Sequence, residues 1–178
     1  MSKDNNKESK FLSLVSRVVS CTRCPRMAGS ARVLGPGCGP LDAPLMFVGE
    51  APGRLGADGS HLPFHGDKSG HNFEKLIEQV GISRYQTFVT NAVLCNPKDD
   101  RGNNATPTSL EIANCAPFLR ETIEILQPTL VVTLGAVALK ACGLLETHAI
   151  TLREHVRTKN SWMGRSLVPV YHPGQRAM

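Results

Sequence analysis

Three polar side chains of different chemistry accompany apolar runs in this sequence. Glu50 follows the run LMFVG, Asn91 lies within TFVTNAVL, and His172 comes soon after SLVPV. A carboxylate can stabilise a cation or orient a water molecule, and an imidazole can donate to a developing anion. An amide offers one acceptor and two donors, so it can read the edge of a ligand. If the three side chains meet, they supply complementary groups for catalysis and recognition.

Each of these residues also has an ordinary structural interpretation. Glu50 could be a solvated loop charge, Asn91 an Asx turn at a strand end, and His172 a loop residue bonded to backbone. What favours a site is the shared position of all three near the ends of apolar runs. The elements that carry them must therefore decide whether they converge.

The cysteines offer a second kind of chemistry. Cys21 and Cys24 form a Cys-x-x-Cys pair, Cys95 leaves an apolar run, and Cys115 lies in a helical segment. Four thiolates distributed in this way can close a tetrahedral site for Zn²⁺ or for a [4Fe–4S] cluster, and plain burial is the alternative. The other two cysteines are interpreted as outside the site. Disulfides are not expected, because we find no export signal and the cytosol keeps thiols reduced.

The elements that position these residues alternate between strands and helices. The predicted strands are residues 45–49, 87–94, 129–135 and 166–170, and the predicted helices are residues 11–20, 69–81, 108–127 and 136–143. The strands are continuous apolar runs, which is typical of a parallel sheet covered on both faces. The sequence therefore predicts a three-layer α/β/α fold with a central four-stranded parallel sheet. The carboxyl ends of parallel strands share one edge, so Glu50, Asn91 and His172 are expected to converge there.

Length and composition set broader limits. The polar composition of residues 1–8 predicts a disordered N-terminus. The chain length of 178 residues predicts a single domain, over residues 9–178. A hydrophobic content of 41% and a charged content of 20% are typical of a soluble globular protein. No apolar run approaches the roughly 18 residues that span a bilayer, and no signal peptide is visible, so we expect a cytoplasmic protein. The net charge of +5 suits a polyanionic partner without requiring one.

Several motifs, taken in order, resemble the uracil-DNA glycosylase superfamily and specifically its iron–sulfur-containing family 4. They are the Cys-x-x-Cys pair, VGEAPG, LPFHGDKSG, FVTNAVLCNP, ATPTSLEIANC, PTLVVTLGAVA and HPG. The resemblance covers Cys21 to Pro173, and FHGDKSG is more similar to family 5. It implies a uracil-DNA glycosylase-like fold. It also implies a monofunctional uracil-DNA glycosylase, a hydrolase of base excision repair that flips uracil out of DNA and hydrolyses its N-glycosidic bond.

The resemblance implies a role for individual residues. Glu50 would lie beside the sugar and the attacking water, and His172 would face the uracil O2 as negative charge develops there. Phe64 would stack on the flipped base, and Asn91 would pair with the uracil edge. The neighbouring substrate-binding positions in the first motif are Gly49, Ala51, Pro52 and Gly53.

The resemblance further implies a cofactor and a partner. Cys21, Cys24, Cys95 and Cys115 would hold a structural [4Fe–4S] cluster, with Zn²⁺ as the alternative. The implied partner is uracil-containing DNA, single- or double-stranded, and we expect a monomer without a membrane partner. Two other functions stay open. One is a glycosylase of the same fold for hypoxanthine or xanthine, and the other is a catalytically weak DNA-binding module that keeps the fold and the cluster.

The sequence departs from the family pattern at three places. Ala51 stands where another branch of the superfamily has a water-activating aspartate or asparagine. The segment between Cys95 and Cys115 is longer than usual, and Asn104 falls near the histidine of a covalently trapping subgroup, so covalent trapping is not expected. Relatives continue after HPG with an intercalating loop and a helix, whereas this sequence ends at Met178. Either the chain is truncated or it relies on its remaining surface to bind DNA, and its DNA affinity stays open.

Overall fold

A computed structural model describes residues 2–174 of the chain, with side chains from residue 6 onward. Its strands are β1 (Leu45–Gly49), β2 (Thr87–Asn91), β3 (Leu130–Leu134), β4 (Asn160–Trp162) and β5 (Arg165–Val170). Its α-helices are α1 (Ser2–Val19), α2 (Ala57–Ser60), α3 (Lys68–Gln79), α4 (Ser109–Leu126), α5 (Ala136–Leu145) and α6 (Leu152–His155). Short 3-10 helices occur at η1 (Pro25–Met27), η2 (Pro36–Cys38) and η3 (Arg84–Gln86).

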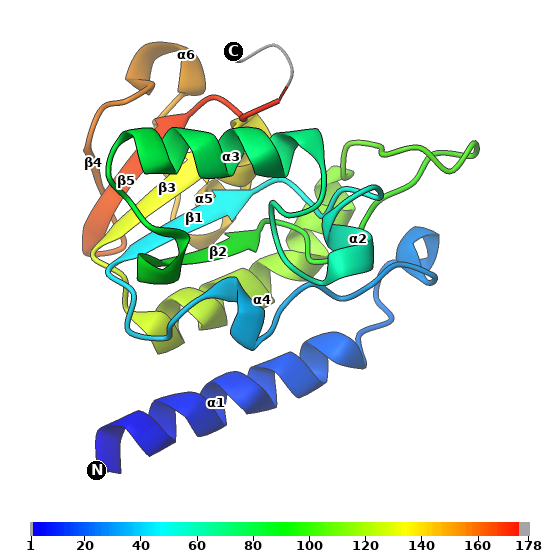
Figure 1. The fold of residues 1–178 in the computed structure, drawn as a ribbon, viewed down its shortest axis with the longest axis horizontal. Coiled ribbons are helices and arrows are strands. Elements are labelled where there is room, and N and C mark those ends of the chain that lie inside the picture. The colour runs from blue at the N-terminus through cyan, green and yellow to red at the C-terminus, as the bar shows by residue number, and fades with distance from the viewer. Residues whose placement is uncertain (1, 175–178) are drawn as a thin grey trace.

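The strands form one sheet with the order β2–β1–β3–β5–β4 (Figure 1). β1 pairs in parallel with β2 and β3, and β3 pairs in parallel with β5. The predicted four-stranded parallel sheet is therefore confirmed as the centre of the fold. From β1 the chain moves outward to β2 and then returns to β3 on the other side of β1. Such a reversal of strand order creates a crevice at the carboxyl ends of the strands, where ligands bind in open α/β sheets.

A fifth strand, β4, was not predicted. It pairs antiparallel with β5 at the edge of the sheet, joined by a two-residue turn at Met163 and Gly164. These two residues have φ angles of 47° and 68°, which is the backbone conformation that tight hairpin turns require. β4 has three residues and no apolar run, so the sequence pattern gave no signal for it.

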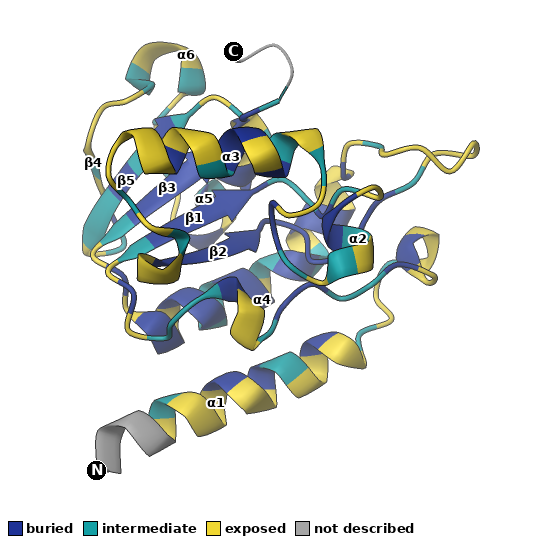
Figure 2. Cartoon of the chain, viewed as in Figure 1, coloured by how far each residue is buried: buried dark blue, intermediate teal, exposed yellow. Residues whose placement is uncertain are grey.

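Helices cover both faces of the sheet, as predicted. Met46 and Val48 of β1 face a core shared with α1, α4 and α5, whereas Phe47 faces a second core with residues of α3. α3 lies on one side of the sheet and α4 and α5 on the other, with α1 packed outside α4 (Figure 1). The central strands are buried along nearly their whole length (Figure 2). This two-sided burial explains why the strands are continuously apolar rather than alternating.

Helix α1 begins at Ser2 and so extends through most of the segment predicted to be disordered, of which Met1 lies outside the described residues. The Lys7 ammonium group donates hydrogen bonds of 3.1 Å to the carbonyl oxygens of Leu41 and Leu126. Leu126 is the last residue of α4, where unpaired carbonyl groups favour a cation. The polar composition of residues 1–8 concealed these long-range contacts.

Helix α4 begins with the capping box that the sequence predicted. The Thr108 hydroxyl accepts a hydrogen bond from the Glu111 amide at 3.2 Å, and the Glu111 carboxylate accepts one from the Thr108 amide at 2.7 Å. This reciprocal pair fixes the start of the helix directly after the polar loop that follows β2. None of the helices in residues 2–174 is long and apolar enough to cross a membrane.

Candidate active site

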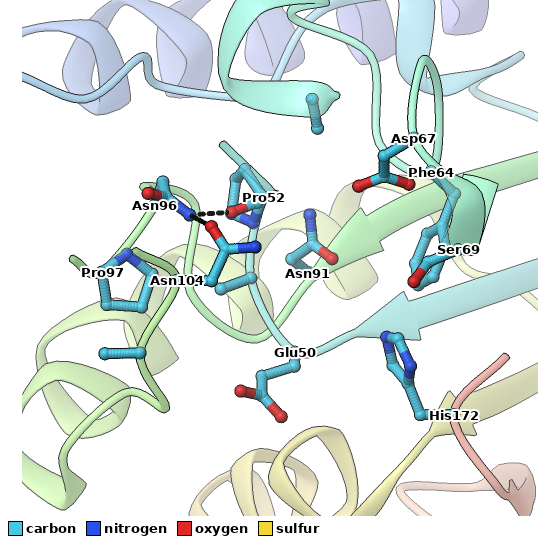
Figure 3. Close-up of a pocket in the computed structure, with 14 residues that line it drawn as sticks. Glu50, Pro52, Phe64, Asp67, Ser69, Asn91, Asn96, Pro97, Asn104 and His172 are labelled. Carbon is cyan, nitrogen blue, oxygen red and sulfur yellow. Dashed lines mark hydrogen bonds between the residues drawn. The ribbon is translucent and has the colours of Figure 1, made fainter. Parts of the chain in front are cut away.

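The carboxyl ends of β1, β2 and β5 open into one pocket (Figure 3). The sequence-predicted residues that line it are Glu50, Ala51, Pro52, Gly53, Phe64, Asn91 and His172. Gly49 lies behind them as the last residue of β1 and the register partner of Asn91. The structure thus brings together side chains that leave three separate strands, and the role of each remains a prediction.

Asn91 forms the floor of the pocket and is only 2% exposed. Its side-chain nitrogen Nδ2 is buried and has no hydrogen-bond partner among the described residues. Buried polar groups nearly always have a partner, because leaving one unpaired costs about 1–3 kcal/mol. An unpaired amide donor that lines a pocket therefore indicates a place for a ligand acceptor.

Gly49 allows Asn91 and Phe64 to approach the end of β1 closely. A Cβ atom on residue 49 would lie 2.4 Å from Asn91 Oδ1 and 2.5 Å from Phe64 Cε2. Both distances are far inside van der Waals contact, so any larger residue would displace one of the two side chains. The glycine of the first motif is thus required by the packing of the pocket floor.

Glu50 is the first residue after β1 and is half-buried in the pocket wall. Burial raises the pKa of its carboxyl group above the ordinary value, because desolvation penalises the charged form. The carboxylate makes no hydrogen bond or ion pair with any residue in the described part of the chain. Its backbone carbonyl is used, accepting a 3.0 Å hydrogen bond from the Val93 amide. The backbone of Glu50 is therefore anchored, while its carboxylate has no partner in the described part of the chain that would compete with a ligand.

His172 follows β5 on the opposite side of the pocket from Asn104 and Pro52 (Figure 3). Desolvation lowers the pKa of its imidazole below the ordinary value, and the charge of Asp67 opposes this shift only in part. The imidazole is consequently neutral near pH 7, with one N–H donor. Its ring lies 5.7 Å from the ring of Phe64, centroid to centroid.

Phe64 is held in a strained backbone conformation with a φ angle of 51°. Such a conformation persists only where the surroundings enforce it. The Arg84 guanidinium group donates a 2.6 Å hydrogen bond to the carbonyl oxygen of Pro63, the preceding residue. The Phe64 ring packs at 5.0 Å on Phe73 of α3, and Gly70 of α3 leaves room for the Phe64 backbone. These contacts fix an aromatic face toward the pocket.

Two further pocket residues, Asp67 and Ser69, were not predicted. Asp67 is the N-cap of α3, and its Oδ1 atom accepts a 2.8 Å hydrogen bond from the Gly70 amide. The sequence signal was present, since an aspartate directly before a helical period is a typical N-cap. It was missed because the helix was predicted to begin at residue 69 rather than at Lys68.

Asn96 and Asn104 also line the pocket and were not predicted to do so. Asn96 is 1% exposed, and its Nδ2 atom donates to the Pro52 carbonyl at 2.5 Å and to Asn104 Oδ1 at 2.9 Å. These bonds fasten the loop after β2 to the loop after β1. The sequence showed only a polar, turn-rich segment here, because hydrogen bonds between two loops leave no local pattern.

The four cysteines selected by spacing line a second, smaller pocket. These residues are Cys21, Cys24, Cys95 and Cys115. The Leu94 amide donates to Cys115 Sγ at 3.4 Å, and Asn114 Nδ2 lies 3.6 Å from Cys24 Sγ as a donor. Burial raises the pKa of Cys95 to about 11 and that of Cys115 to about 12. Cys38 and Cys142, which were interpreted as outside the site, are buried elsewhere.

Within residues 2–174, no three His, Cys, Asp or Glu side chains converge closely enough to hold a single metal ion. Four thiolates around one ion, each about 2.3 Å from it, must lie within about 4 Å of one another. The four cysteines nevertheless line one pocket.

The chain belongs to the uracil-DNA glycosylase superfamily, whose family model matches residues 36–178. It is 34% identical over 166 residues to a type-4 uracil-DNA glycosylase of Thermotoga maritima, covering 92% of this chain and 82% of that protein. It is 32% identical over 166 residues to a type-4 enzyme of Saccharolobus solfataricus, covering 90% and 74% respectively. It is also 29% identical over 187 residues to a type-5 enzyme of Pyrobaculum aerophilum, covering 89% and 80%. The resemblance inferred from the motifs is thereby confirmed.

Proposed function

We propose that this protein is a monofunctional uracil-DNA glycosylase, which hydrolyses the bond between uracil and deoxyribose in DNA. The observation that carries the proposal is the buried, unpaired amide nitrogen of Asn91 on the floor of a pocket that also holds Glu50 and His172. Membership of the superfamily, and similarity to proteins named type-4 and type-5 uracil-DNA glycosylases, support the same activity.

Recognition of the base follows from the atoms of the Asn91 amide. Its Nδ2 atom can donate to the O4 atom of uracil, and its Oδ1 atom can accept from N3–H. Cytosine presents the reverse pattern at these two atoms, so both hydrogen bonds would be lost. The base must be flipped out of the helix to reach the pocket, at a cost of a few kcal/mol. Stacking on the ring of Phe64 offsets part of that cost.

Cleavage separates charge along the N-glycosidic bond, and the pocket has a group for each side. As the C1′–N1 bond breaks, its electron pair leaves with uracil, and the sugar becomes cation-like. The Glu50 carboxylate stabilises this cation and accepts a proton from the water whose oxygen bonds to C1′. The neutral His172 imidazole donates to the uracil O2, where the negative charge gathers. Glu50 is the only carboxylate of the first motif, VGEAPG, and the residue after it is Ala51.

We further propose that Cys21, Cys24, Cys95 and Cys115 hold a [4Fe–4S] cluster. Support comes from their shared pocket, from the amide donors that face two of the sulfur atoms, and from the similarity of the chain to type-4 uracil-DNA glycosylases. Zn²⁺, which four thiolates can also hold, is the alternative. When bound, the cluster supplies a covalent link and no redox step in this reaction. The cysteines would join the residues after α1 to the exit of β2 and to α4.

The proposed partner is DNA, bound by a monomer. The net charge of +5 supports a polyanionic partner, since phosphate contacts dominate affinity for DNA. One chain supplies the pocket floor, the aromatic face of Phe64, and the two proposed catalytic side chains, Glu50 and His172. A second copy of the chain is therefore not needed for catalysis. We propose that the protein acts in the cytoplasm on uracil-containing DNA, single- or double-stranded.

A strand-cleavage assay tests the proposed function. Purified protein is incubated with oligonucleotides that carry one uracil, hypoxanthine, xanthine or cytosine, and abasic sites are then cut with alkali. We expect cutting of the uracil strand only, in both single- and double-stranded form. Release of hypoxanthine or xanthine instead would move the function to another deaminated base. Binding without any release would favour the weak DNA-binding module.

A further inference from the structure

Asn104 lies on a loop that is held in one conformation although it is exposed. The loop runs from Asn96 to Thr108, and Lys98 pairs with Asn104 across it in an antiparallel bridge. At its tip, Asp99 Oδ1 accepts hydrogen bonds from the amides of Arg101 and Asn103, at 2.9 and 2.8 Å. The tip is therefore a defined turn rather than a free end.

The base of the same loop is fastened by Arg26. The Arg26 guanidinium group donates to the carbonyl oxygens of Lys98 and Thr106, both at 3.4 Å. It also forms a two-pronged ion pair with Glu111, at 2.9 and 2.5 Å. Arginine and carboxylate groups paired in this way fix geometry as well as add energy. The loop thus reaches the pocket mouth already ordered.

The amide of Asn104 has a defined orientation. Its Oδ1 atom accepts hydrogen bonds of 2.9 Å from the Arg54 backbone amide and 2.9 Å from Asn96 Nδ2. Because the Arg54 amide can only donate, the atom facing it must be the oxygen. The Asn104 Nδ2 atom is consequently the free end, and it donates to no residue in the described part of the chain. Figure 3 shows this nitrogen turned toward the space in front of Asn91.

We propose that Asn104 Nδ2 binds an acceptor oxygen on the sugar–phosphate of the flipped nucleotide. The inference rests on the proposed function, which places the base against Phe64 and Asn91. Asn104 stands across the pocket from Phe64 and His172, beside Pro52, so it faces the remainder of the nucleotide (Figure 3). Within a DNA strand, the deoxyribose and phosphate groups carry hydrogen-bond acceptors and no donors, and an amide donor to an anionic oxygen is a strong contact. Asn104 is thereby a substrate-binding residue and not a catalytic one.

Two substitutions separate this contact from the loop clamp. Asn104→Asp keeps the Oδ1 acceptor for Arg54 and Asn96 but removes the donor, whereas Asn104→Ala removes both. Excision of uracil is measured in single turnovers over a range of enzyme concentrations, together with direct binding of uracil-containing and undamaged DNA. We expect both variants to need about tenfold more enzyme for half-saturation, with the limiting rate changed less than about threefold. The matched control is Asn103→Ala on the same exposed turn, which should behave as wild type.

Several results would overturn the inference. If Asn104→Asp behaves as wild type while Asn104→Ala is impaired, the side chain serves only as a clamp. If the Asn104→Asp defect is equal on undamaged DNA, or disappears when salt is raised, charge repulsion explains it. A lower limiting rate at unchanged half-saturation would place Asn104 in the chemical step instead. If the wild-type protein leaves uracil in place, the proposed function fails, and the binding titrations still decide whether Asn104 contacts a uracil nucleotide.

Discussion

At the scale of single residues, burial acts in opposite directions on the two proposed catalytic groups. It raises the pKa of Glu50 and lowers that of His172, because in both cases the neutral form is favoured. Burial therefore moves the two pKa values toward each other, and we expect Glu50 ionised with His172 neutral at pH values above the raised pKa of Glu50. This is the pair of states that the proposed reaction requires.

Replacing Glu50 with glutamine should slow excision strongly. The amide keeps the size of the side chain but cannot stabilise a cation or accept a proton, so we expect a loss on the order of 10²-fold or more in single-turnover rate. Binding to an abasic-site duplex should change little, because phosphate contacts dominate it. A Glu50→Gln protein with the wild-type rate would make Glu50 a solvated loop charge.

The pH profile provides a control for this assignment. In the wild type, the rate should fall as the pH drops through the pKa of Glu50, which lies above its ordinary value of 4.5. The Glu50→Gln variant should lack this acidic limb and keep a residual, flat rate. An unchanged acidic limb in the variant would assign the titration to another group.

Asn91→Asp should change which base is accepted. An ionised aspartate has no donor for the uracil O4, whereas it can accept from the exocyclic amine of cytosine. We expect weaker excision of uracil by at least about tenfold, with detectable release of cytosine from single-stranded oligonucleotides. Intact uracil excision in this variant would mean that Asn91 is a turn residue at the end of β2.

At the scale of elements, the ends of β1 and β2 must stay close for the pocket floor to form. Gly49→Ala would place a Cβ atom 2.4 Å from Asn91 Oδ1 and 2.5 Å from Phe64 Cε2. We expect kcat/KM for uracil DNA to fall by about tenfold or more while the protein remains folded, as judged by thermal unfolding. Gly59→Ala is the matched control, since a Cβ there meets no atom within 4 Å. Equal activity of both variants would show that the close approach is not needed.

At the scale of the whole molecule, the cysteine pocket joins segments that are distant in the sequence. Cys95→Ala should remove most of the bound iron and the broad absorption at about 400 nm. It should also lower the thermal unfolding temperature by several degrees, because the link between the segment after α1 and the sheet is lost. Cys142→Ala and Cys38→Ala should retain the iron, since both residues lie outside this pocket. One zinc and no iron in the wild-type protein would contradict the cluster.

The sequence by itself determined the class of fold and the edge at which the candidate site lies. Continuous apolar runs report two-sided burial, and the carboxyl ends of parallel strands meet at one edge of a sheet. The positions of Glu50, Asn91 and His172 at that edge therefore followed from local pattern alone. The start of α4 followed in the same way, because a capping box is formed by residues only three positions apart.

Only the tertiary structure decided what surrounds these residues. The positive φ angle of Phe64 is enforced by Arg84 and α3, and the place of Asn104 is set by bonds to Asn96 and Arg54. The extent of α1 likewise depends on carbonyl groups that Lys7 reaches at Leu41 and at the end of α4. Periodicity reports whether a residue is buried, but it does not report which distant segment donates to it or packs on it. Contacts between loops leave no repeat in the sequence, so the walls of the pocket became visible only once the chain was folded.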